Sequence, residues 1–230
     1  MLSASSSPFP DLGYPLGGVS GGGWNLEGST SDANVGVVVQ AATGGVVAPF
    51  EGSQFARFNR TSGGDAIVYG DFSTLPAAGN VLRVEAMIYV PSTYETNAYG
   101  AQIAIKQGGP SGWSQAPNPK TSAPGNLNQI VHYDIDVGGY VDVGVPFQFD
   151  VWEKWTMEFE VGGTVIDLFS IGSNSVTNVT GAAVAGDSSI GVWFGMQSDS
   201  EFFVDAVPEP SALVLLGCGL ISLAFWRKRR

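Results

Sequence analysis

Several segments of this sequence alternate apolar and polar residues with a period of two, and this feature restricts the fold more than any other. Within residues 81–90, one set of alternate positions holds Leu82, Val84, Ala86, Ile88 and Val90. The other set holds Arg83, Glu85, Met87 and Tyr89. Such a pattern is typical of a β-strand with one face against a core. Residues 130–137 and 155–161 alternate in the same way, so the sequence predicts β-structure in all three places.

Turn-forming residues separate these segments. The chain holds 32 Gly and 13 Pro, and outside its last residues no stretch of ten has a helical period. We recognise about ten strand-like segments, which predict an all-β fold, an antiparallel jelly-roll β-sandwich. The sandwich domain is expected over residues 35–207, with a loop at 41–49. Residues 1–34, rich in Gly, Ser and Pro, are expected to form an irregular lead-in.

The distribution of charge limits the partners of this domain. Residues 1–207 hold six Lys and Arg against twenty Asp and Glu, a net charge of −14. Such a surface repels nucleic acid and anionic lipid, and is compatible with neutral sugars and divalent cations. The single Cys, Cys218, lies in the C-terminal tail. The domain is therefore predicted to have no disulfide, no Cys nucleophile and no Cys metal site.

The C-terminal tail, residues 208–230, has a different composition. The apolar segment 211–226 would span about 24 Å as a helix, against about 30 Å of hydrocarbon in a bilayer. We expect it to be a transmembrane helix, because Trp226 suits the interface and basic side chains can snorkel. Four bases end the chain: Arg227, Lys228, Arg229 and Arg230. The positive-inside rule keeps them cytoplasmic and predicts that the acidic domain is exported. These patterns alone fit either a permanent anchor or a processing signal.

The order of features in this tail resembles a known sorting signal. The motif comprises Val207, Pro208, Glu209 and Pro210, and an apolar segment and terminal bases follow it. This arrangement resembles the PEP-CTERM signal of Gram-negative bacteria. The resemblance implies recognition by an exosortase, a transient stay in the inner membrane with the N-terminal side out and the C-terminal side in, and removal of the helix. It also implies delivery to the cell surface or an extracellular exopolysaccharide matrix.

The N-terminus fits this expectation less well. The family normally has an N-terminal signal peptide, whereas residues 1–8 lack a basic region and an apolar region. We therefore expect the true start of the protein to lie upstream. A cytosolic protein is the alternative.

The domain itself has a second resemblance, spread over residues 20–207. Its order of features is similar to galactose-binding-like carbohydrate-binding modules, although laminin-G-like sandwiches fit nearly as well. The first features are a Gly-Trp pair that ends at Trp24 and a Gly-Ser-x-Phe strand at Gly52–Phe58. A long alternating strand at Val81–Val90 and a strand that begins with Trp at Trp155–Val161 follow. The closing strand contains an Asp, in Val204-Asp205. The resemblance implies the fold, and a fold does not define a function.

A long loop carries the candidate sugar-binding residues. Residues 107–126 hold several Gly and Pro and one large aromatic residue, Trp113. Together with Tyr94 and Tyr99 on a neighbouring loop, Trp113 is a candidate platform for stacking against a pyranose ring. The alternative is that these residues fold onto the sandwich as a lid.

Two groups of carboxylates are candidate calcium sites. A two-residue hairpin after residue 137 would put Asp142 on an apolar face, so we predict a three-residue loop, Gly138–Tyr140, that keeps this face apolar. This register places Asp136 opposite Asp142, with Asp134 on the same face, where a cation would relieve repulsion. A solvated acidic face is the alternative. Glu51 and Asp205 would form a structural calcium site of the kind that the module resemblance implies. No other cofactor is expected.

The sequence offers little for catalysis. It has one His, His132, and the Glu-x-Asp-x-x-Glu motif of sandwich β-glucanases is absent. We therefore predict a non-enzymatic protein that is a structural or adhesive component associated with exopolysaccharide. A carbohydrate-binding module that uses Trp113 is the alternative, and a glycan hydrolase or lyase is the third hypothesis.

Overall fold

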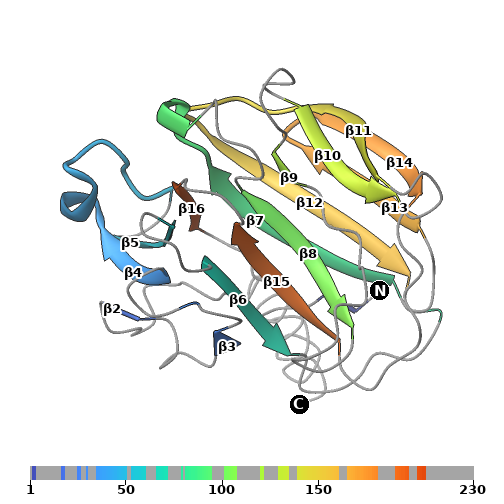
Figure 1. The fold of residues 1–230 in the computed structure, drawn as a ribbon, viewed down its shortest axis with the longest axis horizontal. Coiled ribbons are helices and arrows are strands. Elements are labelled where there is room, and N and C mark those ends of the chain that lie inside the picture. The colour runs from blue at the N-terminus through green and yellow to red at the C-terminus, as the bar shows by residue number, and fades with distance from the viewer. Residues whose placement is uncertain are drawn as a thin grey trace, which may run out of the picture.

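Two β-sheets face each other in the computed structural model of this protein (Figure 1). Strands pair antiparallel throughout the described residues, except for one short parallel pair. The predicted all-β sandwich is therefore confirmed. The structure describes residues 2–3, 17–18, 25–26, 30, 35–50, 53–60, 66–71, 79, 81–94, 101–107, 120–121, 129–134, 139–160, 165–180, 190–196 and 201–205.

The larger sheet, here called sheet A, has nine strands. In spatial order these are β14 (Asn174–Thr180), β13 (Val165–Ile171), β12 (Trp152–Glu160), β7 (Val81–Tyr89), β16 (Glu201–Asp205), β5 (Gln54–Asn59), β4 (Val35–Val39) and β2 (Gly17–Gly18). The ninth strand, β1 (Leu2–Ser3), pairs in parallel with β7. Strand β16 lies between β5 and β7, so the last described strand is close to the centre of the sheet.

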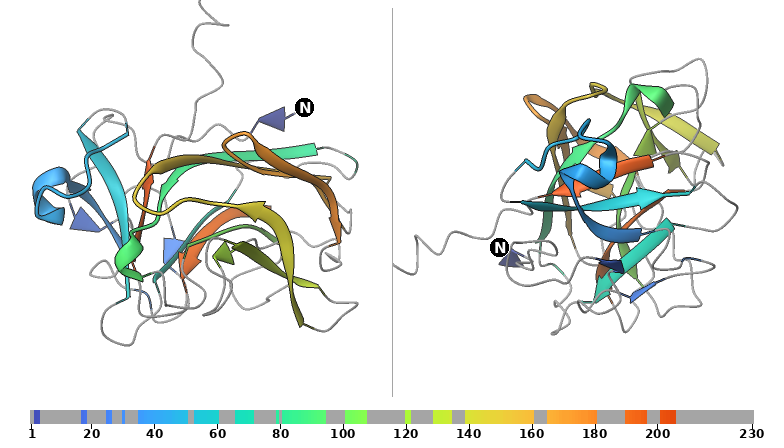
Figure 2. Two further views of the ribbon diagram at one scale, coloured as in Figure 1. Left: turned by 90° about the horizontal axis from the view of Figure 1, so that it is seen from above. Right: turned by 90° about the vertical axis from the view of Figure 1, so that its left-hand side faces the viewer.

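The smaller sheet, sheet B, has seven strands. Their order is β11 (Gly139–Pro146), β10 (Gln129–Asp134), β9 (Lys120–Thr121), β8 (Gln102–Gln107), β15 (Ile190–Met196), β6 (Ala66–Asp71) and β3 (Asn25–Leu26). The left-hand view of Figure 2 shows the two layers from the side. The count of about ten strands is not confirmed, because several short segments such as β1, β2, β3 and β9 also pair.

The principal core lies between the two sheets. Strand β12 contributes Trp155, Met157 and Phe159, all almost completely buried, and sheet B contributes residues such as Ile103 and Val145. The predicted alternation is confirmed on β7 and just beyond it, where Val84, Ala86, Ile88 and Val90 are buried in this core. Burial of aromatic and aliphatic side chains of this size is the main force that holds such sheets together.

A second, smaller core lies on the opposite face of sheet A. It contains Val47, Phe55, Tyr89 and Phe203, with Val38 and Trp152 packed against them. Residues 40–50, here called the strap, cover this face; they comprise the 3-10 helix η2 (Gln40–Thr43) and the loop that follows. The sequence predicted a loop here and one buried face for β7. Tyr89 is buried in this second core and Met87 is buried as well, so the second face of β7 is also covered in this part of the strand.

The predicted hairpin between β10 and β11 has the wrong register. Tyr133 pairs with Tyr140 and Asp134 with Gly139, so Asp142 lies opposite Val131 and cannot lie opposite Asp136. The prediction assumed that only one face of β10 is buried. Ile130 and Val131 are adjacent and both buried, so both faces are covered there and the assumption fails.

Helices are few in the described part of the chain. It contains η2 and a second 3-10 helix, η3 (Ser92–Tyr94), and no helix there is long and apolar enough to cross a membrane. The predicted transmembrane helix at 211–226 lies outside the described residues and stays a prediction. Strands β1, β2 and β3 lie within residues 1–34, the expected irregular lead-in.

Candidate functional site

Four aromatic rings form a cluster on the strap side of sheet A. Phe55 contacts Trp152 and Phe203 edge to face, with ring centroids 6.1 and 5.4 Å apart. Tyr89 contacts the same two rings at 5.5 and 6.0 Å. Edge-to-face contacts at these distances are favourable in addition to the burial of apolar area. Adjacent strands bring the rings together: Phe55 comes from β5, Phe203 from β16, Tyr89 from β7 and Trp152 from β12.

Hydrogen bonds attach the strap to this cluster. The indole Nε1 of Trp152 donates to the carbonyl of Ala48 at 2.9 Å. The main-chain N–H of Phe50 donates to Oδ2 of Asp205 at 2.6 Å, and Asp205 is only 2% exposed. Within the strap, Val47 N–H donates to Oγ1 of Thr43 at 3.1 Å. The strap is therefore held by side chains from both β12 and β16.

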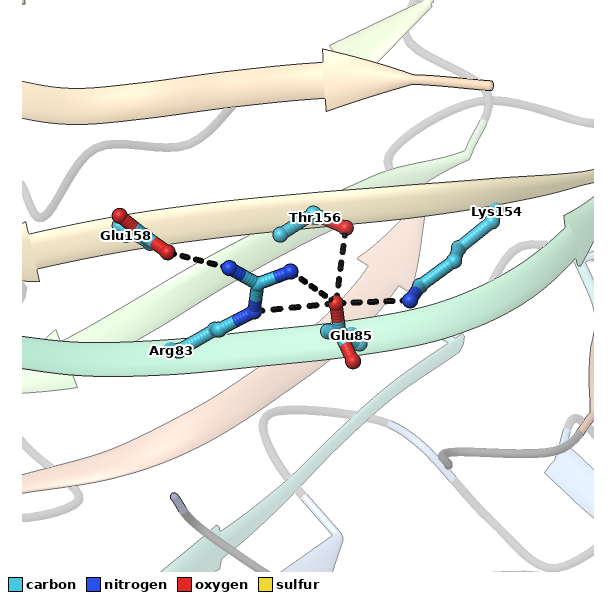
Figure 3. A network of polar contacts seen from close by, with 5 residues as sticks. All are labelled: Arg83, Glu85, Lys154, Thr156 and Glu158. Carbon is cyan, nitrogen blue, oxygen red and sulfur yellow. Dashed lines mark hydrogen bonds and ion pairs between the residues drawn. The ribbon is translucent and has the colours of Figure 1, made fainter. Parts of the chain in front are cut away.

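A polar network occupies the neighbouring part of the same face (Figure 3). One oxygen of Glu85, Oε1, accepts from Nη2 of Arg83 at 2.6 Å and from Nζ of Lys154 at 2.8 Å. The hydroxyl of Thr156 donates to the same oxygen at 3.3 Å. Nη1 of Arg83 also donates to Glu158 Oε1 at 2.5 Å. Strands β7 and β12 pair with Glu85 opposite Thr156 and Arg83 opposite Glu158. Basic and acidic side chains therefore lie beside one another across the two strands.

This network changes the acidity of its members. Burial alone would raise the pKa of Glu85, but the hydrogen bonds and charges of Lys154 and Arg83 outweigh it, and the pKa is lowered. The hydrogen bond to Glu85 raises the pKa of Arg83. Farther along the face, Arg57 pairs with Glu201. Three of the six bases in residues 1–207 thus lie here, each beside a glutamate, which favours a neutral polar ligand over a polyanion.

Asp150 fixes the turn that leads into β12. Its carboxylate Oδ1 accepts from the Ser92 N–H at 2.9 Å, and its own N–H donates to the carbonyl of Val90 at 2.9 Å. Hydrogen bonds from the hydroxyl and N–H of Ser92 lower the pKa of Asp150, and the Tyr89 hydroxyl adds to this. Burial, followed by the charge of Asp150, raises the pKa of Tyr89. The residue adopts a positive φ of 62°, which Asp tolerates better than most residues.

Glu153 is a carboxylate whose environment the sequence analysis missed. Burial raises its pKa, although a hydrogen bond from Gln148 N–H at 2.7 Å opposes the rise. The sequence indicates this environment, because Glu153 occupies the same set of alternate positions in β12 as Trp155, Met157 and Phe159. That set faces the principal core. A partly buried carboxylate is a candidate general acid, but glycoside hydrolysis needs a second carboxyl group nearby.

Most of the candidate sugar-binding residues lie outside the described part of the chain. Trp113 and Tyr99 are outside it. The backbone of Tyr94 is described as the last residue of η3, but its side chain is not. The stacking platform therefore stays a prediction.

Only one side chain of each candidate calcium group is described, so both sites stay predictions. Asp142 is exposed, and its Oδ1 accepts from the Gly144 N–H at 2.7 Å. Asp136 and Glu51, and the side chain of Asp134, lie outside the described residues. Asp205 accepts the Phe50 N–H, as described above. Among the described side chains, no group of three or more His, Cys, Asp or Glu is arranged to hold a metal ion.

Known structures with some likeness to this chain include both binding and catalytic proteins. The carbohydrate-binding module CBM66 from Bacillus subtilis is 12% identical with a TM-score of 0.43, over 68% of this chain and 86% of the module. A carbohydrate esterase from Shiga toxin-encoding bacteriophage phi24B is 12% identical with a TM-score of 0.47, over 81% and 92%.

A third likeness is to the catalytic domain of a GH131 β-glucanase from Podospora anserina. It is 15% identical with a TM-score of 0.45, over 82% of this chain and 85% of that domain. At TM-scores below 0.5, these likenesses carry no argument about what this chain does. No curated protein matches the chain in sequence.

The C-terminal segment, in contrast, matches a defined family. The match begins at residue 206, directly after the last described residue of β16, and extends to residue 230. It includes the motif Val207–Pro210, the apolar segment and the terminal bases that the sequence analysis singled out. This chain therefore carries, at residues 206–230, a PEP-CTERM protein-sorting motif.

Proposed function

We propose that this is an exported protein that an exosortase sorts and processes through its C-terminal motif. The observation that carries the proposal is the match of residues 206–230 to the sorting motif. The charge distribution supports it, because four bases follow the apolar segment and a net charge of −14 precedes the motif. Before processing, the helix 211–226 spans the inner membrane of a Gram-negative bacterium, with the β-sandwich outside and the bases inside.

For the β-sandwich we propose a structural or adhesive role without enzymatic activity, at the cell surface or in an exopolysaccharide matrix. The paired cations on sheet A support a contact with neutral polar groups such as sugar hydroxyls. The sequence also has one His and no Cys before the tail, which leaves few nucleophile–base combinations.

The sorting proposal is tested by the mass of the mature protein. In the native host, the surface protein is expected to lack the mass of Arg227–Arg230. A variant with Pro208, Glu209 and Pro210 replaced by Ala is expected to keep this mass and to stay in the membrane fraction. Pro146→Ala, at an exposed position at the end of β11, is the matched control and should be sorted normally. Wild-type surface protein that still carries Arg227–Arg230 would refute the proposal.

A second candidate function is that of a carbohydrate-binding module that uses Trp113, with Tyr94 and Tyr99. It is supported by the place of Trp113 in the sequence, in the long segment between β8 and β9, since long connections between strands often carry binding residues. A glycan array probed with the full chain tests it. Binding should be lost in Trp113→Ala and kept in Trp152→Phe, the control, which keeps an aromatic ring beside Phe55 and Tyr89. Binding that Trp113→Ala leaves unchanged, or no binding at all, removes this candidate.

A further inference from the structure

The exposed large apolar side chains of the described residues are Val46, Phe50 and Val151, which are 77%, 46% and 40% exposed. Val46 and Phe50 belong to the strap, and Val151 is next in sequence to Trp152, which is hydrogen-bonded to the strap. Val46 precedes Val47, which is buried in the second core, and Phe50 ends the strap. Val151 precedes Trp152, whose indole donates to Ala48 in the strap. These three residues are here called the strap patch. Figure 2, right-hand view, looks onto this end of the sandwich.

Phe50 of the strap patch lies beside the last described residue before the sorting segment. Phe50 N–H is 2.6 Å from the carboxylate of Asp205, and Asp205 is the last residue of β16. Six peptide units join Asp205 to Ser211, where the apolar segment begins. A fully extended chain of this length reaches about 20 Å. When the apolar segment crosses a membrane, Asp205, and with it the main chain at Phe50, is therefore held within about that distance of the bilayer.

The strap itself differs in charge from the rest of the domain, although Glu51 follows Phe50 and Asp150 precedes Val151. No Asp, Glu, Lys or Arg lies between Asp32 and Glu51, a segment that includes the whole strap, although residues 1–207 carry a net charge of −14. An acidic surface is repelled from anionic lipid, whereas an uncharged apolar one is not. Within the strap, Val46 and Phe50 are therefore exposed apolar side chains on a segment with no charge of its own, which suits a contact with lipid.

We propose that the strap patch rests in the interfacial layer of the bilayer while the sorting segment is membrane-bound. The contact orients the sandwich and keeps residues 207–210 at the membrane surface, where a membrane protease would meet them. This proposal deepens the proposed function and rests on it. Apolar side chains at such an interface enter the boundary between headgroups and acyl chains by about 5–10 Å.

Fluorescence quenching in phosphatidylcholine vesicles tests the contact with the full chain. In a Cys218→Ser background, a single cysteine is placed at Val46→Cys or Val151→Cys and labelled with an environment-sensitive probe. Thr177→Cys, exposed on the edge strand β14, is the matched control, and a label on the native Cys218 reports insertion of the tail. The vesicles contain nitroxide lipids with the nitroxide near the headgroup or at the end of the acyl chain.

We expect blue-shifted emission at Val46→Cys and Val151→Cys, with stronger quenching by the headgroup-proximal nitroxide, and no change at Thr177→Cys. Adding Phe50→Asp should reduce the quenching at Val151→Cys. If Cys218 is quenched while Val46→Cys and Val151→Cys behave like Thr177→Cys, the strap contact is refuted and the sorting proposal stands. An unquenched Cys218 refutes the membrane span, and the strap contact with it. If quenching appears only when exosortase is added, the strap patch contacts the enzyme, and the lipid contact is refuted.

Discussion

A single buried carboxylate, Asp205, fixes the strap to the central strands of sheet A. We expect Asp205→Ala to lower the free energy of unfolding by about 1–3 kcal/mol, because the Phe50 N–H then loses its partner in a poorly solvated place. Asp205→Asn should cost less, since an amide oxygen still accepts. Denaturant unfolding of the full chain in detergent measures both.

The control for this measurement is Asp142→Ala. Asp142 is exposed and accepts only a local hydrogen bond from Gly144 among those described, so its replacement should change stability by no more than about 0.5 kcal/mol. Equal effects of the two Ala variants would show that the Phe50–Asp205 contact does not hold the strap.

Glu153 gives stability a pH dependence opposite to that of most carboxylates. Burial raises its folded pKa above the unfolded value of 4.5. Its favourable contribution is therefore present below the unfolded pKa and is lost as pH rises through the folded pKa. Glu153→Gln should raise the thermal midpoint at pH 7 and leave it almost unchanged at pH 4. Glu160→Gln, exposed on the same strand, is the control; a lower midpoint at pH 7 for Glu153→Gln would contradict the prediction.

At the scale of elements, the pairing of β7 with β12 depends in part on the polar network around Glu85. Glu85→Gln would leave Arg83 and Lys154 close together without the anion between them, so we expect a loss of about 1 kcal/mol at pH 7. The lowered pKa of Glu85 means that this contribution is present above pH 4.5 and is lost as pH falls through the lower folded pKa.

Urea unfolding of both proteins as a function of pH measures this loss, and the difference between them should shrink below pH 4.5. Glu158→Gln is the matched comparison and should cost less, because Glu158 meets only Arg83 in this network. A difference that stays constant down to pH 3 would show that the loss comes from packing and not from charge.

The sequence predicted these elements well where buried and exposed residues alternate along the strand. It predicted them poorly where both faces of a strand are covered. The inward residues of β7 and β12 follow directly from alternation. Phe203 and Tyr89 face the other side and are buried in the second core, to which the strap, far away in sequence, contributes Val47. The β10–β11 register failed because Ile130 and Val131, which are adjacent and face opposite sides, are both buried. Alternation reports one face of a strand and contains no information about what covers the other.

For the whole molecule, the sorting segment was predictable because its signal is local. Motif, apolar length and terminal bases are contiguous in residues 207–230, and the family match covers the same segment. The polar network and the strap contacts were not predictable, because they join residues such as Arg83 and Glu158, or Phe50 and Asp205, that are brought together by strand order. Trp113 remains a prediction, since it lies outside the described residues.

The excess of acids in the whole domain predicts how salt acts on its stability. A net charge of −14 over residues 1–207 opposes the compact state through self-repulsion, and salt screens this repulsion. Salt also weakens the ion pairs around Glu85 and Arg57, but exposed pairs contribute only about 0–1 kcal/mol each. Repulsion among many charges should dominate, so the thermal midpoint of the full chain is expected to rise with NaCl. A midpoint that falls would mean that the ion pairs dominate.

We propose that Glu51 and Asp205 form a structural calcium site. The same melting experiment can distinguish such a site from general screening by salt. CaCl2, MgCl2 and NaCl are compared at equal ionic strength, so that they screen similarly. A structural site is expected to raise the midpoint more in CaCl2 than in MgCl2, because Ca²⁺ accepts irregular carboxylate and carbonyl ligands more readily than Mg²⁺. Asp205→Asn should remove this excess while keeping the response to NaCl. Equal thermal midpoints in CaCl2 and MgCl2 would contradict a calcium site. The acidic surface would then respond only to the charge of the ion, through screening, and not to its identity.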